Sequence, residues 1–330
     1  MARILITGGA GYIGSHMVLE LVKNNYEVVV LDNLSKSSLQ QIKRLESLIG
    51  KKLEFIEGDV LYDLEKVVGN IDGVVHFAAF KLVPESVTDP LKYYKNNTQG
   101  VFSLLTWMQT RGIKRLIFSS TAAVYGDDVE VPTDETARIT PASPYGKSKY
   151  FAEQAIADMC FASGTKAIAF RYFNVAGNEL DGKIGDADLK SQALIPNIML
   201  TALGKRDTEF KILGKDYDTL DGTTIRDFVH VLDLVSAHRL GLEKLDSMHN
   251  NFEVINLGSQ NGYTIKQVFD TFIKISGGDL KYAYGDRRPG DVVRSIASNK
   301  KAQELLGWQV EKSLEDMLVS AWKWYQNITK

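Results

Sequence analysis

Three glycines, Gly8, Gly11 and Gly14, stand at the junction of an apolar run at 4–7 and a helix-length segment near 12–24. A tight turn of this kind needs residues that tolerate a positive φ, and a backbone that closely approaches a pyrophosphate leaves no space for a Cβ atom. The helix that follows presents free N–H groups and the positive end of its dipole to an anion. We therefore expect a dinucleotide-binding turn here, in preference to a tight turn that binds no ligand.

Apolar, β-branched runs alternate with helix-length segments through the first half of the chain, which is the pattern of parallel α/β folds. Chirality and crossover rules favour the assembly of such a pattern into a doubly wound parallel sheet, the Rossmann arrangement. The expected strands are 4–7, 27–31, 53–56, 74–77, 115–119 and 167–171, and the expected helices lie near 12–24, 37–49, 90–111 and 145–163.

The composition of the chain changes after about residue 174, where polar and glycine-bearing segments predict loops. We expect a dinucleotide-binding domain over 1–175 and a smaller C-terminal α/β domain for the substrate over 176–330. A short apolar run at 254–257 predicts a late strand. Segments near 228–258 are therefore expected to return to the first domain.

The composition excludes several classes of protein. Hydrophobic residues make up 44% and charged residues 24% of the 330 residues, and the formal net charge is −2. These values are ordinary for a globular protein and favour neither nucleic acid nor a membrane as a partner. A single cysteine, Cys160, rules out an internal disulfide and indicates a cytoplasmic location. The few histidines lack the spacing of ligands, so we expect no metal site.

Asp32 and Asp59 each follow an expected strand. Asp32 lies about 20 residues beyond the glycines, where a carboxylate accepts a hydrogen bond from a ribose 2′-hydroxyl and repels a 2′-phosphate. NAD is therefore the expected cofactor rather than NADP, although Lys36 lies close by in the sequence. Asp59 either faces the adenine amino group or caps a helix.

Tyr145 and Lys149 are four residues apart, so their side chains share one face of a helix. A free tyrosine has a pKa near ~10 and is a poor base at neutral pH. An ammonium beside it and a positively charged nicotinamide both favour the phenolate. Alone, this spacing is more often a solvated surface pair. With the glycine turn upstream, it predicts a base placed beside a dinucleotide, and hence redox chemistry on an alcohol.

Thr121 stands just after the strand expected at 115–119, between the glycine turn and the Tyr145/Lys149 pair in the chain. A hydroxyl in this position can hydrogen-bond the substrate oxygen whose proton is moved. The alternative is an ordinary loop hydroxyl.

A series of motifs, in order and at matching spacing, runs nearly the whole length of the chain. They are Thr7 to Gly14, Leu31-Asp32-Asn33-Leu34, His76-Phe77-Ala78-Ala79 with Lys81, Tyr93-Tyr94-Lys95-Asn96-Asn97, Ser119-Ser120-Thr121 with Val124-Tyr125-Gly126, Ser143 to Lys149, Arg171-Tyr172-Phe173-Asn174, Arg226 to Val231, and Arg287-Arg288-Pro289-Gly290-Asp291. With these motifs the chain resembles the extended short-chain dehydrogenase/reductase family, and within it the nucleotide-sugar 4-epimerases.

The resemblance implies three groups of site residues. Tyr145 would be the base, Lys149 its electrostatic partner and Thr121 a hydrogen bond to the substrate. The NAD site would comprise Gly8, Gly11, Tyr12, Ile13, Gly14, Asp32, Asn33, Asp59, Val60, Phe77, Ala78, Lys81, Asn96, Ser119, Tyr145, Lys149 and Tyr172. The nucleotide sugar would contact Lys81, Thr121, Tyr145, Asn174, Leu194, Arg226, Arg288, Asp291 and Ser295. Arginine forks suit a diphosphate, although the two arginines are alternatively surface salt-bridge partners.

The segment after Thr121 bears on the reaction. Relatives that dehydrate a hexose place Asp-Glu directly after the threonine, and those that decarboxylate a uronic acid tend to carry Glu before Val-Tyr-Gly. This chain has Ala122 and Ala123 at these places. The resemblance therefore implies 4-epimerisation of UDP-glucose and UDP-galactose through a 4-keto sugar, with NAD recycled, as an activity of galactose metabolism. A 4-epimerase of UDP-uronic acids or of N-acetylated sugars and a non-enzymatic NAD-binding sensor are the alternatives.

Two positions depart from the family pattern. Ala193 precedes Leu194 where relatives often have Asn or His at a uridine-side contact. Ser295 aligns where some epimerases carry a bulky tyrosine, and a small residue would leave space for an N-acetyl group. The resemblance also implies a homodimer, with the helices near 90–111 and 145–163 at the interface.

Overall fold

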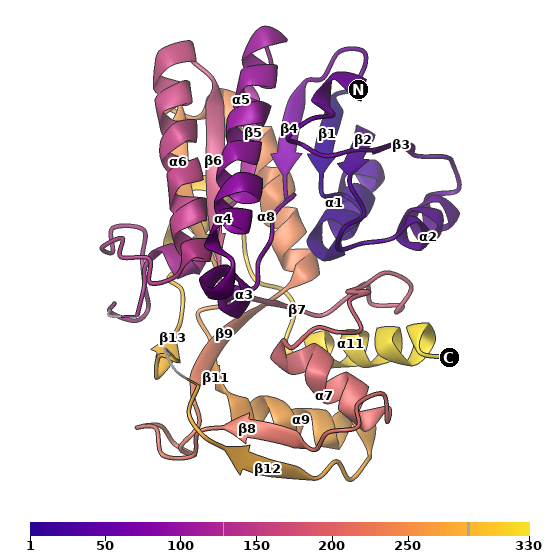
Figure 1. Cartoon of the computed structure of the whole chain (residues 1–330), viewed down its shortest axis with the longest axis vertical. Helices are drawn as coiled ribbons and strands as arrows, with labels where there is room; N and C mark the ends of the chain where they lie inside the picture. The colour runs from indigo at the N-terminus through magenta and orange to yellow at the C-terminus, as the bar shows by residue number, and fades with distance from the viewer. Residues whose placement is uncertain (128, 289–290) are drawn as a thin grey trace.

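Figure 1 shows the computed structural model, which describes residues 1–127, 129–288 and 291–330. Its larger part is a sheet of seven parallel strands in the order β10-β6-β5-β4-β1-β2-β3. The doubly wound parallel sheet predicted from the alternating pattern is therefore confirmed. The strands are β1 (Arg3–Thr7), β2 (Glu27–Asp32), β3 (Glu54–Glu57), β4 (Gly73–His76), β5 (Arg115–Ser119), β6 (Lys166–Tyr172) and β10 (Phe252–Leu257).

Side chains on the two faces of this sheet belong to two separate cores, because successive residues of a strand point to opposite sides. In β1, Ile4 and Ile6 pack with α1, α2 and α8, whereas Leu5 packs with α5 and α6. Strands covered on both faces read as continuous apolar runs, which is why their positions could be predicted. The helices named here are α1 (Tyr12–Lys23), α2 (Leu39–Ile49), α5 (Gly100–Thr110), α6 (Pro144–Ser163) and α8 (Val231–Lys244).

The helix expected near 90–111 is helical throughout but is not a single α-helix. It consists of α4 (Pro90–Tyr93), a π-helical segment at Tyr94–Gln99, and α5, and it follows the short helix α3 (Val83–Thr88). The buried side chain of Asn97, in the π-helical segment, accepts from the N–H of Phe80 at 2.9 Å and donates to its carbonyl at 3.0 Å. This clamp gives a physical reason for the irregularity, which an apolar pattern does not reveal.

The smaller part, below the large sheet in Figure 1, is built around β9 (Ile225–His230). The first half of β9 pairs with β11 (Gly262–Thr264) and β13 (Arg294–Ser295), and its second half pairs with β7 (Asn174–Ala176). Within the stretch 228–258, α8 and β10 belong to the large sheet and its covering helices, whereas β9 belongs to the smaller part. The remaining elements are α7 (Leu194–Ala202), β8 (Phe210–Leu213), α9 (Ile265–Ser276), β12 (Tyr282–Gly285), α10 (Lys300–Leu306) and α11 (Leu314–Ile328).

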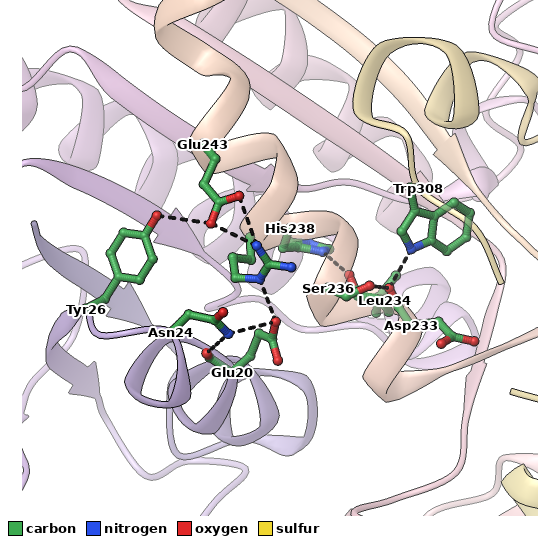
Figure 2. Close-up of polar contacts among 10 residues, drawn as sticks. Glu20, Asn24, Tyr26, Asp233, Leu234, Ser236, His238, Glu243 and Trp308 are labelled. Atoms are coloured by element: carbon green, nitrogen blue, oxygen red, sulfur yellow. Dashed lines mark hydrogen bonds and ion pairs between the residues drawn. The ribbon is translucent and has the colours of Figure 1, made fainter. Parts of the chain in front are cut away.

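Helix α8 is fixed on the large sheet by polar contacts that Figure 2 shows. Arg239 of α8 donates to Glu20 of α1 at 2.7 Å and to Glu243, one turn further along α8, at 2.8 Å. The indole N–H of Trp308 donates to the carbonyl oxygen of Asp233 at 2.8 Å, which holds the segment after α10 on α8. Among the residues described, no helix is both long and apolar enough to cross a membrane.

Four buried histidines make stability depend on pH. Burial lowers the pKa of His16 and His238 to about 4 and that of His76 and His230 to about 3. In the unfolded chain these pKa values lie near ~6.5, so above that pH the rings are neutral in both states. Below it, the unfolded chain binds protons that the folded chain does not, and the folded state loses about 1.4 kcal/mol per pH unit for each ring.

We predict that the free energy of unfolding, measured in urea, falls as the pH is lowered from about 6.5 to about 5. In His238→Leu, the slope of the free energy of unfolding against pH should be smaller by about the contribution of one bound proton. The new side chain can pack among Phe77, Phe170 and Tyr172 without titrating. A free energy of unfolding that stays constant over this range, or an unchanged slope in the variant, would contradict the prediction.

Candidate active site

The glycine turn has the geometry of an anion-binding βα turn. Gly8 follows β1 with a φ of +72°, and Gly11 stands at the N-cap of α1 without a side chain that could cap it. A Cβ atom at Gly14 would lie 2.1 Å from the carbonyl oxygen of Gly8, so the turn closes only around glycine. The first turn of α1 carries no acidic residue, which leaves its positive dipole end available to a phosphate.

Tyr12 and Ile13, which open α1, direct their side chains into the protein. The hydroxyl of Tyr12 donates to the carbonyl oxygen of Gly177, and Ile13 packs against the core beneath α1 and α2. Backbone N–H groups, rather than these side chains, are therefore what the two residues can offer to a ligand in the turn.

The carboxylate of Asp32 lies beside the glycine turn at the end of β2. One oxygen accepts from the N–H of Ala10 at 3.0 Å, and the other accepts from the N–H of Leu34 and the hydroxyl of Ser37 at 2.9 and 2.8 Å. These donors hold the carboxylate at the position where the sequence places the ribose contact. Ser37 was missed because only its place after the strand distinguishes it from other serines.

Asn33 and Asp59 are brought together by neighbouring strand ends. Asn33 donates from Nδ2 to a carboxylate oxygen of Asp59 at 2.8 Å, and the other oxygen accepts from the N–H of Leu61 at 2.8 Å. Asp59 therefore shapes the turn after β3 instead of capping a helix, since the next helical turn begins at Leu64. Val60, between these contacts, is buried in the core.

The loop after β4 lies against the glycine turn. The N–H of Phe77 donates to the last carbonyl oxygen of β1 at 3.0 Å, and a Cβ atom at Gly8 would lie 2.8 Å from the backbone nitrogen of Ala78. Further along this loop Lys81 is exposed, with Nζ 5.8 Å from the centroid of the Tyr12 ring. The loop thus borders the predicted cofactor site, and Lys81 lies at its Tyr12 side.

Asn96 lies in the π-helical segment, beside the clamp on that loop. Its Nδ2 donates at 3.0 Å to Oδ1 of Asn97, the residue that holds Phe80. The Nδ2 of Asn97 also donates to the hydroxyl of Ser148 on α6 at 3.1 Å. This chain of contacts joins the loop after β4 to the helix that carries Tyr145. Asn97 was quoted in a motif without a role, and its burial is visible only in the structure.

Helix α6 presents Tyr145 and Lys149 at the carboxyl end of β5. Ser143 caps the helix by accepting from the N–H of Gly146 at 3.1 Å, and Tyr145 falls in the first turn. One turn later Lys149 is 2% exposed, and its Nζ donates to the carbonyl oxygen of Ser119 at 2.7 Å. The predicted pair is therefore held inside the protein and is not a solvated surface pair.

Thr121 completes the group. It is buried, and its hydroxyl accepts from the N–H of Ala123 at 3.1 Å. Burial raises the pKa of Tyr145, and the hydrogen bond with Thr121 lowers it. Burial lowers the pKa of Lys149 to about 7, whereas Glu153 raises it. The phenolate and the ammonium are thus each disfavoured alone and favoured as a pair.

Ser119 and Tyr172 meet at the ends of β5 and β6, where their hydroxyls share a hydrogen bond. Burial raises the pKa of Tyr172, so this hydroxyl stays neutral. Both residues lie beside the carbonyl group that holds Lys149, at the edge of the predicted cofactor site.

Arg226 of β9 is the centre of the predicted nucleotide-sugar group. Its Nη2 lies 3.2 Å from Asp291, and its Nη1 donates to the carbonyl oxygen of Val292 at 2.9 Å. Burial lowers the pKa of Arg226, and the paired Asp291 raises it. Arg288 is exposed, and its charge lowers the pKa of Arg226 slightly. Asn174 joins them by donating to the carbonyl oxygen of the residue after Arg226 at 3.0 Å. Pro289 and Gly290 of the quoted motif lie outside the described residues.

The remaining two predicted substrate residues lie in different surroundings. Ser295 pairs with Arg226 across β13 and β9 and lines a small hollow with Ala122, Tyr125 and Phe173. The structure thus brings Ser295 to the turn after Thr121. Leu194 begins α7 and packs against the core of the smaller part.

Three buried charged residues near this site had no predicted role. Asp227, next to Arg226, accepts from the N–H groups of Ser259 and Ala297 at 2.7 and 3.0 Å. Glu153 forms a buried ion pair with Arg171, with Nη2 2.6 Å from a carboxylate oxygen. The available signal for Glu153 was its position four residues after Lys149, on a helix face that otherwise carries small and apolar residues.

The residues present fit NAD. The turn at Gly8, Gly11 and Gly14 has no Cβ atoms to obstruct a pyrophosphate, the first turn of α1 presents N–H groups that the helix itself does not bond, and the Asp32 carboxylate stands at the adjoining strand end. Lys149 of α6 bonds to the carbonyl oxygen of Ser119 at the carboxyl end of β5, which is the edge of the same sheet where parallel α/β folds bind their ligands.

Comparisons with known proteins agree with this site. Residues 4–258 match the model of the NAD dependent epimerase/dehydratase family. The chain is 42% identical to the UDP-glucose 4-epimerase of Dictyostelium discoideum over 98% of its own length and 95% of the relative's.

Two solved structures extend the similarity to the fold. The UDP-glucose-4-epimerase of Stenotrophomonas maltophila, with bound NAD and formylated UDP-arabinopyranose, has a TM-score of 0.94 and 35% identity over 100% of this chain and 99% of that one. The UDP-Glc/GlcNAc 4-epimerase of Campylobacter jejuni has a TM-score of 0.84 and 39% identity over 99% and 100% of the two chains. The chain therefore belongs to the NAD dependent epimerase/dehydratase family, which confirms the family resemblance, the assignment as an enzyme and the NAD cofactor predicted from its sequence.

Proposed function

We propose that the chain catalyses the NAD-dependent epimerisation of UDP-hexoses at C4 and so interconverts UDP-glucose and UDP-galactose. The observation that carries this proposal is the convergence of Tyr145, Lys149 and Thr121 at the carboxyl end of β5, in a chain closely similar to UDP-glucose 4-epimerases. A non-enzymatic NAD-binding sensor would have no need of a buried base, a buried ammonium and a hydroxyl at one point.

Three side chains divide the proton chemistry. Tyr145 removes the proton of the sugar 4-hydroxyl and later returns one, and Lys149 stabilises its phenolate electrostatically. Thr121, at the start of the 3-10 turn that follows β5, donates to or accepts from the same sugar oxygen. Bound NAD supplies the acceptor for the hydride of C4 and the source of its return to the opposite face.

Epimerisation requires the 4-keto sugar to turn over while its nucleotide stays bound. Arg226, Arg288 and Asn174 provide cationic and amide donors to hold the diphosphate and the uridine, and Asp291 orients Arg226. Such an anchor makes the same contacts in both orientations of the sugar, so it favours neither epimer.

The turn that follows Thr121 supports epimerisation over elimination. Ala122 and Ala123 form a 3-10 turn with Val124, and a Cβ atom at Gly146 would lie 2.5 Å from the Ala123 carbonyl oxygen. Neither alanine can supply or remove a proton, so dehydration or decarboxylation would lack an acid or base here.

On the cofactor side of the proposed site, Ser119 and Tyr172 border the nicotinamide. Asp32, Asn33 and Asp59 lie toward the adenosine.

A second activity, on UDP-GlcNAc and UDP-GalNAc, is favoured by Ser295. This small side chain lines a hollow with Ala122, Tyr125 and Phe173, so it leaves space beside the turn after Thr121 that a tyrosine in its place would fill. The structurally similar protein of Campylobacter jejuni is described as a UDP-Glc/GlcNAc 4-epimerase. A UDP-uronic acid 4-epimerase is the remaining candidate, and the presence of Arg294 in the same hollow keeps it open to test with a UDP-uronic acid.

We infer a homodimer through α4, α5 and α6, and the exposed apolar side chains of these helices support it. Leu91, Phe102 and Phe151 are 77%, 48% and 49% exposed, and the ring of Phe151 lies 6.1 Å from that of Tyr94. Large apolar side chains gathered on neighbouring helices mark a protein interface. The partner we infer is a second copy of this chain.

The first experiment is conversion of UDP-galactose to UDP-glucose by the purified protein without an added electron acceptor. Tyr145→Phe should lower kcat by about 10² to 10⁴, because the base is removed while the ring still packs. Tyr150→Phe, on the same helix, is the matched control and should retain activity. Wild-type protein that binds NAD but leaves UDP-galactose unchanged would contradict the proposal.

The N-acetyl activity depends on the volume at one position. Ser295→Tyr should reduce turnover of UDP-GalNAc by at least about tenfold while UDP-galactose is still converted, because the larger ring fills the hollow beside Tyr125. The measurement is the ratio of kcat/KM for the two substrates. A ratio that does not change would show that Ser295 does not set this preference.

The dimer is tested by charge at its apolar face. The double variant Phe102→Glu/Phe151→Asp should sediment as a monomer, because each carboxylate would be buried without a partner in the interface. Leu220→Asp, which alters a 90% exposed leucine in a loop of the smaller part, is the control and should leave the mass unchanged. A wild-type protein that already sediments as a monomer would refute the inference.

A further inference from the structure

A buried ion pair between Glu153 and Arg171 lies one helical turn beyond Lys149. Glu153 follows Lys149 by one helical turn on α6, so the two side chains share a face. The Glu153 carboxylate accepts from Nε and Nη2 of Arg171 at 2.9 and 2.6 Å and from the hydroxyl of Ser120. Glu153 is 0% and Arg171 is 4% exposed, so water screens neither charge.

A contribution to stability does not by itself explain why this ion pair is buried. Ion pairs that are fully buried commonly contribute no more to stability than apolar side chains of similar volume, because desolvation offsets the attraction. Here a second cation, Lys149, is buried beside the same carboxylate. Removal of the carboxylate would leave Lys149 and Arg171 as two cations in a dry site, so Glu153 sets the balance of charge there.

The surroundings of the Lys149 ammonium show how much depends on this carboxylate. Charged and titratable groups from three elements bear on it: Glu153, one turn along α6, raises its pKa, His76 of β4 has its own pKa lowered by it, and Arg171 of β6 pairs with Glu153. Burial and the nearby Lys149 lower the pKa of His76 to about 3, so this ring is neutral. Within the described part of the chain, Glu153 is the one acidic side chain that acts on Lys149.

We propose that Glu153 is a positioning residue whose negative charge keeps the Lys149 ammonium protonated beside Tyr145, while Arg171 moderates that charge. The inference rests on the proposed function, in which the ammonium stabilises the phenolate of the base. Glu153 acts through Lys149 and does not itself touch the reacting sugar.

Arg171 connects this charge balance to the substrate side. Its guanidinium lies 4.9 Å from the centroid of the Tyr125 ring, whose hydroxyl donates to Asn256 of β10 at 2.7 Å. Tyr125 also lines the hollow at Ser295. The carboxylate is therefore held in place from both the catalytic helix and the turn that borders the sugar.

Two substitutions at Glu153 separate charge from shape. Glu153→Gln keeps the length and the hydrogen-bonding capacity but removes the charge, so the alkaline limb of the kcat profile should move to lower pH by about 1 to 3 units. Glu153→Asp shortens the side chain but keeps the charge, so its profile should stay nearer to that of the wild type. A purely structural role predicts the reverse order, because Gln is the closer match in shape.

Arg171→Met provides a change of opposite sign. Without the guanidinium, the Glu153 carboxylate acts on Lys149 unopposed, so the alkaline limb should move to higher pH. KM should change less than kcat in all three variants, because none of these residues is among the predicted substrate contacts. Glu20→Gln, which breaks the Arg239 pair between α1 and α8, is the matched control and should leave the profile in place.

A second readout does not depend on activity. The ultraviolet absorbance of the Tyr145 phenolate, taken as the difference between each protein and its Tyr145→Phe counterpart, should appear at higher pH in Glu153→Gln than in the wild type. If Glu153→Gln shows this shift but the wild type converts no UDP-galactose, the proposed function fails while the inference about Glu153 stands.

The outcomes are distinct. Thermal unfolding first identifies the variants that fold, and either Glu153→Gln or Arg171→Met alone suffices, because each carries its own predicted direction. The expected result is a downward shift for Glu153→Gln, an upward shift for Arg171→Met and a near wild-type profile for Glu153→Asp. An unmoved limb in Glu153→Gln, an unmoved or lowered limb in Arg171→Met, or a larger shift in Glu153→Asp than in Glu153→Gln would overturn the proposal.

Discussion

The parallel register of β1, β4, β5 and β6 is the constraint on which the site depends, because it brings their carboxyl ends to one edge of the sheet. Thr7 pairs with His76, and the Thr7 hydroxyl lies 2.7 Å from Nδ1 of that histidine inside the core. His76 pairs in turn with Phe118, and Ser119 with Phe170. A slip of one residue would move every following side chain to the other face. The glycine turn, the loop after β4 and Thr121 therefore take their relative positions from this register.

Burial at that edge sets the chemistry as much as position does. Each unit of pKa corresponds to about 1.4 kcal/mol, so a Lys149 pKa of about 7 marks a desolvation cost of several kcal/mol. The same burial that disfavours the ammonium also disfavours the phenolate of Tyr145. Neither group is a useful catalyst without the other, and the Glu153 carboxylate ties their charges to a third element, β6, through Arg171. Charge balance in this dry region is consequently a property of several strands and one helix together.

The sequence predicted the strands well because strands covered on both faces are continuous apolar runs, and the 115–119 strand was placed with its observed bounds. It predicted the glycine turn and the Tyr145/Lys149 pair because each has a fixed local spacing. It could not predict the π-helical segment, whose cause is a contact between Asn97 and the distant Phe80. Nor could it separate Glu153 from a surface glutamate, because burial of a charge depends on Arg171 arriving from another element. Ser295 and Ala122 line one hollow although more than half of the chain separates them in the sequence, so no local pattern could predict that they meet.

The difference in rigidity between the two ends of the substrate site has a visible origin. Asp227, beside Arg226, accepts from both donors of Ser259 and from the N–H groups of Gln260 and Ala297, so β9, the turn after β10 and the strand that carries Ser295 are fixed to one carboxylate. The proposed anchor for the nucleotide is therefore built on a fully bonded framework. At the proposed sugar end, Ala122 and Ser295 are small and uncharged, and they lie in one hollow with the rings of Tyr125 and Phe173. A ligand held tightly at one end and loosely at the other can present either face to the same base, which is the geometric requirement of a reaction that inverts one carbon and leaves the rest of the molecule unchanged.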